Sequence, residues 1–130
     1  MGDSTNTRIH MRKLADSAEF LAGDKVHLRE LFNPRNQSEF SGRYSLAHAS
    51  LAAHQSSKPH NLASHELYYI LSGSGRIHID SLSAEISAGC AVEIPPNSRQ
   101  WIENTSNSTL EFLCIVDPAW QAEDETVESS

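Results

Sequence analysis

Short runs that mix apolar and polar residues in alternation follow one another through most of the chain. The clearest is IHID at residues 77–80, where apolar and polar residues alternate at every position. A period of two places one face of a strand against a core and the other toward solvent. The pattern predicts strands over residues 26–32, 43–51, 67–71, 77–80, 84–86, 90–94, 100–103 and 110–116.

Turn-forming residues separate these runs. Gly, Pro, Asn and Ser gather at residues 72–75, 88–89, 95–97 and 104–108. Many short strands joined by such turns are typical of an all-β sandwich or barrel, and no succession of strand and helix suggests a parallel sheet. The segment from Leu14 to Leu21 can form a helical turn or two before Gly23 stops it. We therefore predict an all-β barrel with a short N-terminal helical turn.

The length of 130 residues fits one domain, which we divide into three parts. Residues 1–22 are predicted to form an N-terminal tail with the helical turn, and residues 23–120 to form the barrel. Residues 121–130, QAEDETVESS, are acidic, and we expect them to be a disordered tail.

Charge and cysteine content narrow the functional classes. The net charge is −7 and Lys and Arg form no cluster, which disfavours a nucleic-acid surface. No apolar run is long enough to cross a bilayer, and the polar N-terminus lacks the apolar stretch of a signal peptide. We expect a cytosolic protein without nucleic-acid or membrane partners, in which Cys90 and Cys114 are free thiols.

One segment in the second half of the chain has five residues at spacings that resemble a known motif. Gly89 is followed after five residues by Pro95, then after one residue by Asn97, after two by Gln100 and after three by Asn104. Asn97 suits a turn position with positive φ, because Asn occupies that backbone region more readily than other residues with a side chain.

An earlier segment has His60, Leu62, Glu66 and Gly73 at spacings of its own. The two segments resemble the paired motifs of the cupin superfamily, with Leu62 and Gln100 where the family pattern has His. The runs ELYYILSGSG, IPPN and FLCIVDPAW make the chain most similar to small single-domain microbial cupins. The resemblance implies a double-stranded β-helix, that is, a jelly-roll barrel, with a small-molecule pocket inside.

The resemblance also implies a candidate metal site. Metal-binding cupins hold a divalent transition ion with three His and one Glu, and His60, Glu66 and Gln100 are the residues of this chain at such positions. The ion could be Mn, Fe, Ni or Zn. A fourth ligand could come from His65, if a bulge turned it inward, or from His78. The competing interpretation is a hydrogen-bonded polar cluster around water.

Strand alternation assigns the faces near this site. If Glu66 points inward, so do Tyr68 and Ile70, while Leu67 and Tyr69 face outward. Tyr68 and Glu66 are therefore candidate catalytic groups, although a strand Tyr is more often a packing residue.

Three functions remain open from the sequence. The first is a metal-assisted oxygenase, isomerase or decarboxylase acting on a small molecule. The second is a non-catalytic protein that binds a small molecule, and the third is a structural cupin without metal.

The outer face of the barrel predicts the oligomeric state. Leu71 and Trp101 are expected to face outward together with Leu67 and Tyr69, and so much apolar surface predicts a homodimer.

Overall fold

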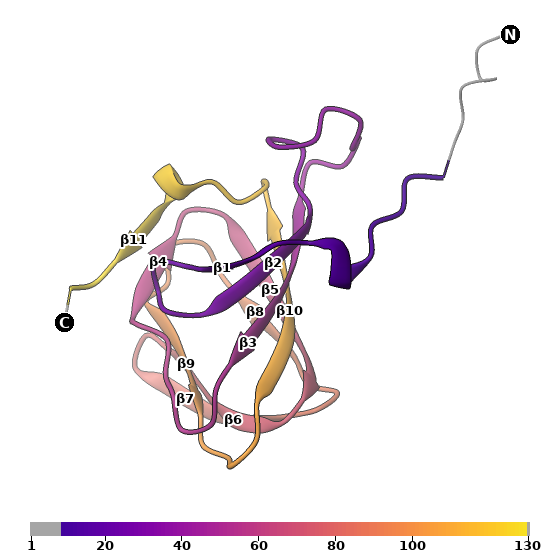
Figure 1. Cartoon of the computed structure of the whole chain (residues 1–130). Helices are drawn as coiled ribbons and strands as arrows, with labels where there is room; N and C mark the ends of the chain where they lie inside the picture. Colours follow the sequence, from indigo (N-terminus) through magenta and orange to yellow (C-terminus); the bar gives the residue numbers. More distant parts are fainter. Residues whose placement is uncertain (1–8, 130) are drawn as a thin grey trace, which may run out of the picture.

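The computed structural model describes residues 9–129, which form two antiparallel sheets that face each other as a barrel (Figure 1). The first sheet has the order β1-β2-β3-β10-β5-β8, and the second has the order β11-β4-β9-β6-β7. The strands of the first sheet are β1 (Glu19–Leu21), β2 (His27–Phe32), β3 (Ser45–Leu51), β10 (Leu110–Asp117), β5 (His65–Ser72) and β8 (Ala91–Ile94). The strands of the second are β11 (Glu125–Val127), β4 (His60–Leu62), β9 (Gln100–Asn104), β6 (Ser74–Ile79) and β7 (Leu82–Ser87). The predicted all-β jelly roll is confirmed.

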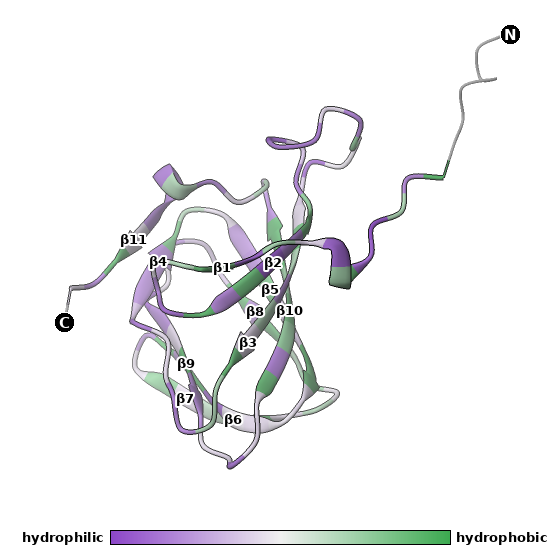
Figure 2. Cartoon of the chain, viewed as in Figure 1, coloured by the Kyte–Doolittle hydropathy of each residue, from purple (hydrophilic) through white to green (hydrophobic). Residues whose placement is uncertain are grey.

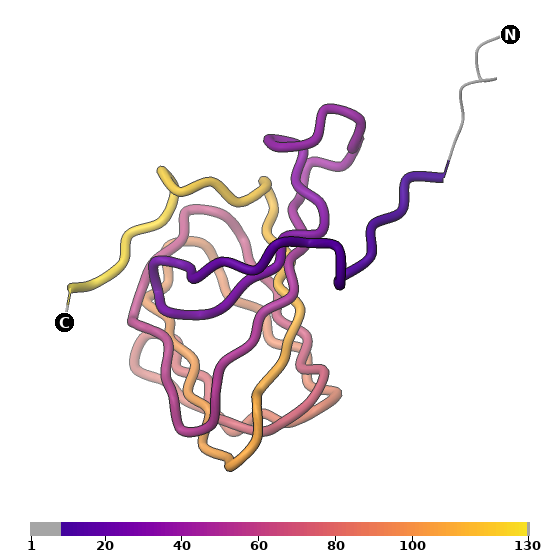
Figure 3. The backbone as a smooth tube through the Cα atoms, in the orientation of Figure 1, coloured from indigo at the N-terminus to yellow at the C-terminus, as the bar shows by residue number. Residues whose placement is uncertain are grey.

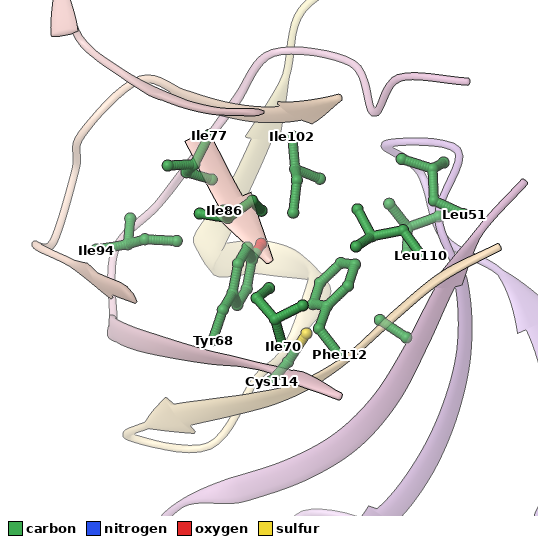
Figure 4. Packing of buried hydrophobic residues seen from close by; sticks show 12 residues of the cluster. Leu51, Tyr68, Ile70, Ile77, Ile86, Ile94, Ile102, Leu110, Phe112 and Cys114 are labelled. Atoms are coloured by element: carbon green, nitrogen blue, oxygen red, sulfur yellow. The ribbon is translucent and has the colours of Figure 1, made fainter. Parts of the chain in front are cut away.

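The core lies between the two sheets and follows the predicted alternation. Along β5 the side chains of Glu66, Tyr68 and Ile70 are buried, and Tyr69 between them is exposed. In Figure 4 Tyr68 and Phe112 from one sheet point into the space that Ile77 and Ile102 occupy from the other. Most of β10 is coloured hydrophobic in Figure 2, with a hydrophilic residue near its start, so this strand also carries apolar side chains on its outer face.

Both ends of the chain differ from the sequence-based expectation. The N-terminal helical turn is a 3₁₀ turn, η2 (Leu14–Asp16), and the chain then forms strand β1 instead of continuing as helix. Residues 121–129 are not a tail, because η3 (Ala122–Asp124) leads into β11, which pairs with β4. Local composition does not reveal this strand, since its stability comes from a distant partner strand. Residues 1–8 and 130 lie outside the described residues.

The two terminal segments meet at one end of the barrel. In Figure 3 the turn before β2 and the segment after β10 lie at the end opposite the turn that precedes β10. Lys58 N–H donates to the carbonyl of Asp24 (2.7 Å), and Ala63 N–H donates to the carbonyl of Asp124 (2.9 Å). Arg99 reinforces the C-terminal segment through two contacts with the carboxylate of Glu128 (2.6 and 3.1 Å). Residues from both ends therefore have fixed positions against the barrel.

Two further expectations concern the cysteines and the membrane. Cys90 and Cys114 are both free, and Cys114 is buried in the core. Among residues 9–129 no helix has the length and apolar character that crossing a membrane requires.

Candidate functional site

A cavity of about 50 Å³ lies inside the barrel at the end where the terminal segments meet. Its lining contains one His and four acidic residues, together with aromatic and aliphatic side chains, and none of these lining residues is Lys or Arg. The polar and aromatic lining residues are His60, Asp24, Glu30, Glu66, Glu125, Phe20, Tyr68, Phe112 and Trp120. The volume has room for on the order of four water-sized groups, so the cavity suits an ion or a very small molecule.

Three polar side chains form a hydrogen-bonded chain, the Glu66 cluster (Glu66, Gln100 and Tyr68), of which Glu66 and Tyr68 line the cavity. The amide Nε2 of Gln100 donates to Glu66 Oε1 (2.7 Å), and the Tyr68 hydroxyl donates to Gln100 Oε1 (3.1 Å). Glu66 and Tyr68 lie on β5 and Gln100 on β9, so the chain of bonds joins the two sheets. All three side chains are buried. The sequence-based expectation that these residues converge therefore agrees with the structure.

Burial raises the pKa values of two groups in this cluster. The pKa of Glu66 is raised to about 7, chiefly by burial and to a lesser extent by the carboxylates of Asp24 and Glu125, while the Gln100 hydrogen bond and His60 oppose the shift. Burial also raises the pKa of the Tyr68 hydroxyl well above its ordinary value, so Tyr68 keeps its proton as a donor. Near neutral pH Glu66 can therefore either accept or release a proton.

His60, on β4, lies on another part of the cavity wall with its ring orientation set by the backbone. Its Nδ1 is 2.9 Å from the carbonyl oxygen of Lys58, and because a carbonyl only accepts, Nδ1 carries the hydrogen. In the neutral ring Nε2 then presents a lone pair. Nε2 lies 3.6 Å from Asp24 Oδ2 and 3.8 Å from Glu125 Oε2, both beyond hydrogen-bonding distance.

Asp24, His60 and Glu125 form a second cluster, the His60 cluster, in which three potential ligand atoms lie within 4.8 Å of one another. Burial raises the pKa of Asp24 and that of Glu125. Asp24 comes from the turn between β1 and β2, and Glu125 begins β11. The sequence analysis missed both, since turns and tails have no strand period. The signal available for β11 was the pair of β-branched residues Thr126 and Val127, which favour a strand.

The remaining candidates from the sequence lie outside the cavity. His65 faces outward from β5, with its Nε2 2.8 Å from Glu93 Oε2. His78 stacks on Trp101 on the outer face of the second sheet, with ring centroids 3.6 Å apart, and its Nε2 lies 3.2 Å from Glu103. No bulge turns His65 inward, because its pairing with Asp117 continues the regular register of β5 and β10. The structure therefore does not bring either His to Glu66.

Comparison with known proteins agrees with the fold. The family model described as "Cupin domain" matches residues 47–116. An uncharacterised protein from Methanocaldococcus jannaschii, MJ1618, is 33% identical over 107 residues, which cover 81% of this chain and 83% of that protein.

The names of solved structures with the same fold state different activities. A predicted oxalate decarboxylase from Thermotoga maritima has a TM-score of 0.71 and 23% identity, covering 82% of this chain and 97% of that one. A nucleoside dehydratase from Streptomyces has a TM-score of 0.74 and 18% identity, covering 93% of this chain and 92% of that one. At these identities the likeness concerns the fold alone. The family match and the relative from M. jannaschii together establish that the chain belongs to the cupin family.

Proposed function

We propose that this cupin binds a small polar molecule in the barrel cavity, with Glu66 as the side chain that contacts it. The observation that carries the proposal is the way Glu66 is held. Gln100 fixes its Oε1, whereas its Oε2 has no hydrogen-bond partner among residues 9–129. A buried carboxylate oxygen beside free volume indicates a polar partner such as water or a ligand.

The chemistry of the cavity favours a neutral ligand with hydroxyl or carbonyl groups. Four acidic side chains without Lys or Arg in the lining disfavour a free anion. With a pKa near neutrality, Glu66 can donate to a carbonyl or accept from a hydroxyl. The same property makes Glu66, with Tyr68 behind Gln100, a candidate for general acid–base catalysis.

Catalysis separates the first two of the three functions that the sequence left open. An oxygenase, isomerase or decarboxylase consumes its ligand, and a binding protein releases it unchanged. The names of the structural neighbours support an enzyme, since one is a predicted oxalate decarboxylase and another a nucleoside dehydratase. The location in the cytosol and the absence of nucleic-acid partners stay predictions from the sequence.

A ligand screen tests the binding proposal. Thermal unfolding of the chain would be followed with very small neutral polyols and carbonyl compounds, each with and without a chelator, and products would be sought by mass spectrometry. Any ligand found should bind about 10-fold or more weakly to Glu66→Gln, since a buried hydrogen bond to a charged group is lost. His65→Asn, which alters only an exposed side chain of the same strand, is the matched control. Equal affinity of the parent and Glu66→Gln would exclude Glu66 as the contact.

The metal set inferred from the family motifs shares its groups with the Glu66 cluster. His60, Glu66 and Gln100 line or border one cavity, and the carbonyl oxygen of Gln100 accepts from Tyr68 while its amide nitrogen donates to Glu66. An amide oxygen has two lone pairs, so the oxygen of Gln100 can accept from Tyr68 and still be a weak ligand for an ion. An ion at this set, whether Mn, Fe, Ni or Zn, is therefore compatible with the bonds of the Glu66 cluster.

We further propose that the chain forms a homodimer through the outer face of the first sheet. Leu67, Tyr69 and Leu71 project from β5, and Leu113 and Ile115 lie beside them on β10 in register with Tyr69 and Leu67. Tyr69 and Leu71 are each more than two-fifths exposed, and a contiguous apolar face of this kind favours association. Light scattering of the parent should give twice the chain mass, and Tyr69→Glu should give the mass of one chain. A monomeric parent at micromolar concentration would exclude the dimer.

A further inference from the structure

We propose that Asp24, His60 and Glu125 bind a divalent first-row transition metal ion. Two of these three ligands come from the ends of the chain, outside residues 47–116, which match the cupin family model. The site differs from the set that the family motifs imply, and it does not depend on the binding of a small molecule.

The unpartnered nitrogen of His60 is the main support. The His60 side chain is 3% exposed, and its Nε2 faces two carboxylate oxygens without a hydrogen bond to either. A lone pair directed at two acceptors is unfavourable in a buried place unless a cation lies between them. The Nδ1–H bond to the Lys58 carbonyl fixes the ring in the orientation and tautomer that metal-binding His residues use.

The distances between the ligand atoms fit an ion after a small contraction. An ion about 2.1 Å from each ligand atom separates neighbouring ligands by about 3.4 Å in a tetrahedron. The observed separations from His60 Nε2 are 3.6 Å to Asp24 and 3.8 Å to Glu125. Side-chain shifts of a few tenths of an ångström would therefore bring both carboxylates to this distance from His60 Nε2. The two carboxylate oxygens, which lie within 4.8 Å of each other, would have to approach by up to about 1.4 Å. A shared proton would instead require the heavy atoms to approach to about 2.8 Å.

Charge and anchoring agree with a metal ion. Two carboxylates balance the charge of a divalent ion, and one imidazole with two carboxylates is a borderline set that suits Mn²⁺ and Zn²⁺. The backbone around each ligand is already ordered, because Glu125 pairs with Leu62 in the sheet and the carbonyl of Asp24 accepts from Lys58. Three protein ligands leave coordination positions for water or for a bound molecule.

Metal titration of the full, tag-free chain tests the site. Calorimetry with Mn²⁺ and with Zn²⁺ at about pH 7.5, where carboxylates and imidazole are available as ligands, should give one ion per chain. Asp24→Asn and Glu125→Gln should each weaken binding by about 100-fold or more, because losing a ligand weakens binding at least as much as losing its supporting partner. The surface control His65→Asn should change the affinity less than about 3-fold. Glu66→Gln should weaken binding less than Asp24→Asn or Glu125→Gln does, because its charge acts on the three ligands but it is not one of them.

Two outcomes would overturn the proposal. One is a parent chain that binds neither ion. The other is a loss in Glu66→Gln as large as in Glu125→Gln, which would assign the ion to the family positions. Thermal unfolding in chelator identifies any variant that fails to fold. Paramagnetic broadening by Mn²⁺ in NMR spectra of the unaltered parent then gives the position without substitution, and it should be stronger at Asp24 and Glu125 than at Gln100.

Discussion

The Glu66 cluster and the His60 cluster line the same cavity, yet their polar atoms are satisfied in opposite ways. In the Glu66 cluster each side chain bonds the next, from Tyr68 through Gln100 to Glu66. In the His60 cluster an imidazole and two carboxylates approach to 3.6 and 3.8 Å without a bond between them. The bonds of the Glu66 cluster stabilise the barrel without any added group, whereas Nε2 of His60 gains a partner only when a cation arrives. The first cluster is therefore expected to support folding as well as the ligand contact of Glu66, and the second to support metal binding.

The largest expected effect follows from removing the centre of the Glu66 cluster. Gln100→Leu leaves a buried carboxyl group and a buried hydroxyl without partners, so the free energy of unfolding should fall by about 3 kcal/mol. Urea denaturation in the presence of chelator measures this. The triple variant Glu66→Leu, Tyr68→Phe, Gln100→Leu should recover most of the loss, because replacing all partners with apolar groups leaves none unsatisfied. A loss below about 1 kcal/mol in Gln100→Leu would mean that the cluster contributes little to stability.

The pH dependence of stability tests Glu66 alone. Its pKa is about 7 in the folded chain and 4.5 is the ordinary value, so the folded state binds this proton more tightly than the unfolded state. The free energy of unfolding of the parent, measured relative to Glu66→Gln, should therefore fall as pH rises from 4.5 to about 7, and stay level above. The expected decrease is about 3 kcal/mol. Denaturation in chelator at several pH values checks it, and a difference that does not change with pH would contradict the raised pKa.

The His60 cluster should respond in the opposite direction to a neutral substitution. Without metal, Glu125→Gln removes a partly buried carboxylate whose desolvation and repulsion by Asp24 outweigh its attraction to His60, so the free energy of unfolding should rise by up to about 1 kcal/mol. With Mn²⁺ in excess the order should reverse, because the parent gains binding energy that the variant lacks. Paired denaturation experiments with chelator and with Mn²⁺ measure both values. A decrease in chelator as large as that of Gln100→Leu would show that the two clusters do not differ in kind.

The smallest effects are expected at the outward histidines. His65→Asn and His78→Asn each remove a partly exposed contact with a carboxylate, so the free energy of unfolding should change by less than about 0.5 kcal/mol. Affinity for metal and for any cavity ligand should stay the same, because neither ring faces the cavity. Calorimetry on both variants checks this. A clear loss of metal affinity in either variant would restore that His as a ligand.

The barrel could be predicted from strand periodicity, and one half of the site from periodicity together with the resemblance to the cupin motifs. Alternation along β5 put Glu66 and Tyr68 on one face, and the resemblance made that face the inner one and brought Gln100 near it. A period of two by itself gives only which residues of a strand share a face.

The other half depends on contacts between segments that are far apart in the chain. Asp24 lies in a turn and Glu125 in a three-residue strand, and about a hundred residues separate them. The acidic composition of residues 121–130 indicated a tail, because composition carries no information about the free edge of β4 that β11 joins. The faces of His65 and His78 agree with strand alternation, and the structure excludes the bulge that would have turned His65 inward.

Segments near both ends of the described chain meet over the cavity, and this affects how the pockets of cupins can diverge. Chain termini tolerate substitution and changes of length better than the strands of a packed barrel. Two of the three groups in the His60 cluster lie on such terminal segments, whereas strands β3 to β10 lie between Ser45 and Asp117, close to the residues that match the family model. A lineage can therefore exchange the chemistry of its pocket by altering a few terminal residues while it inherits the barrel unchanged. Two cupins with superimposable barrels can for this reason differ in specificity, and the terminal segments are the first place to look for the difference.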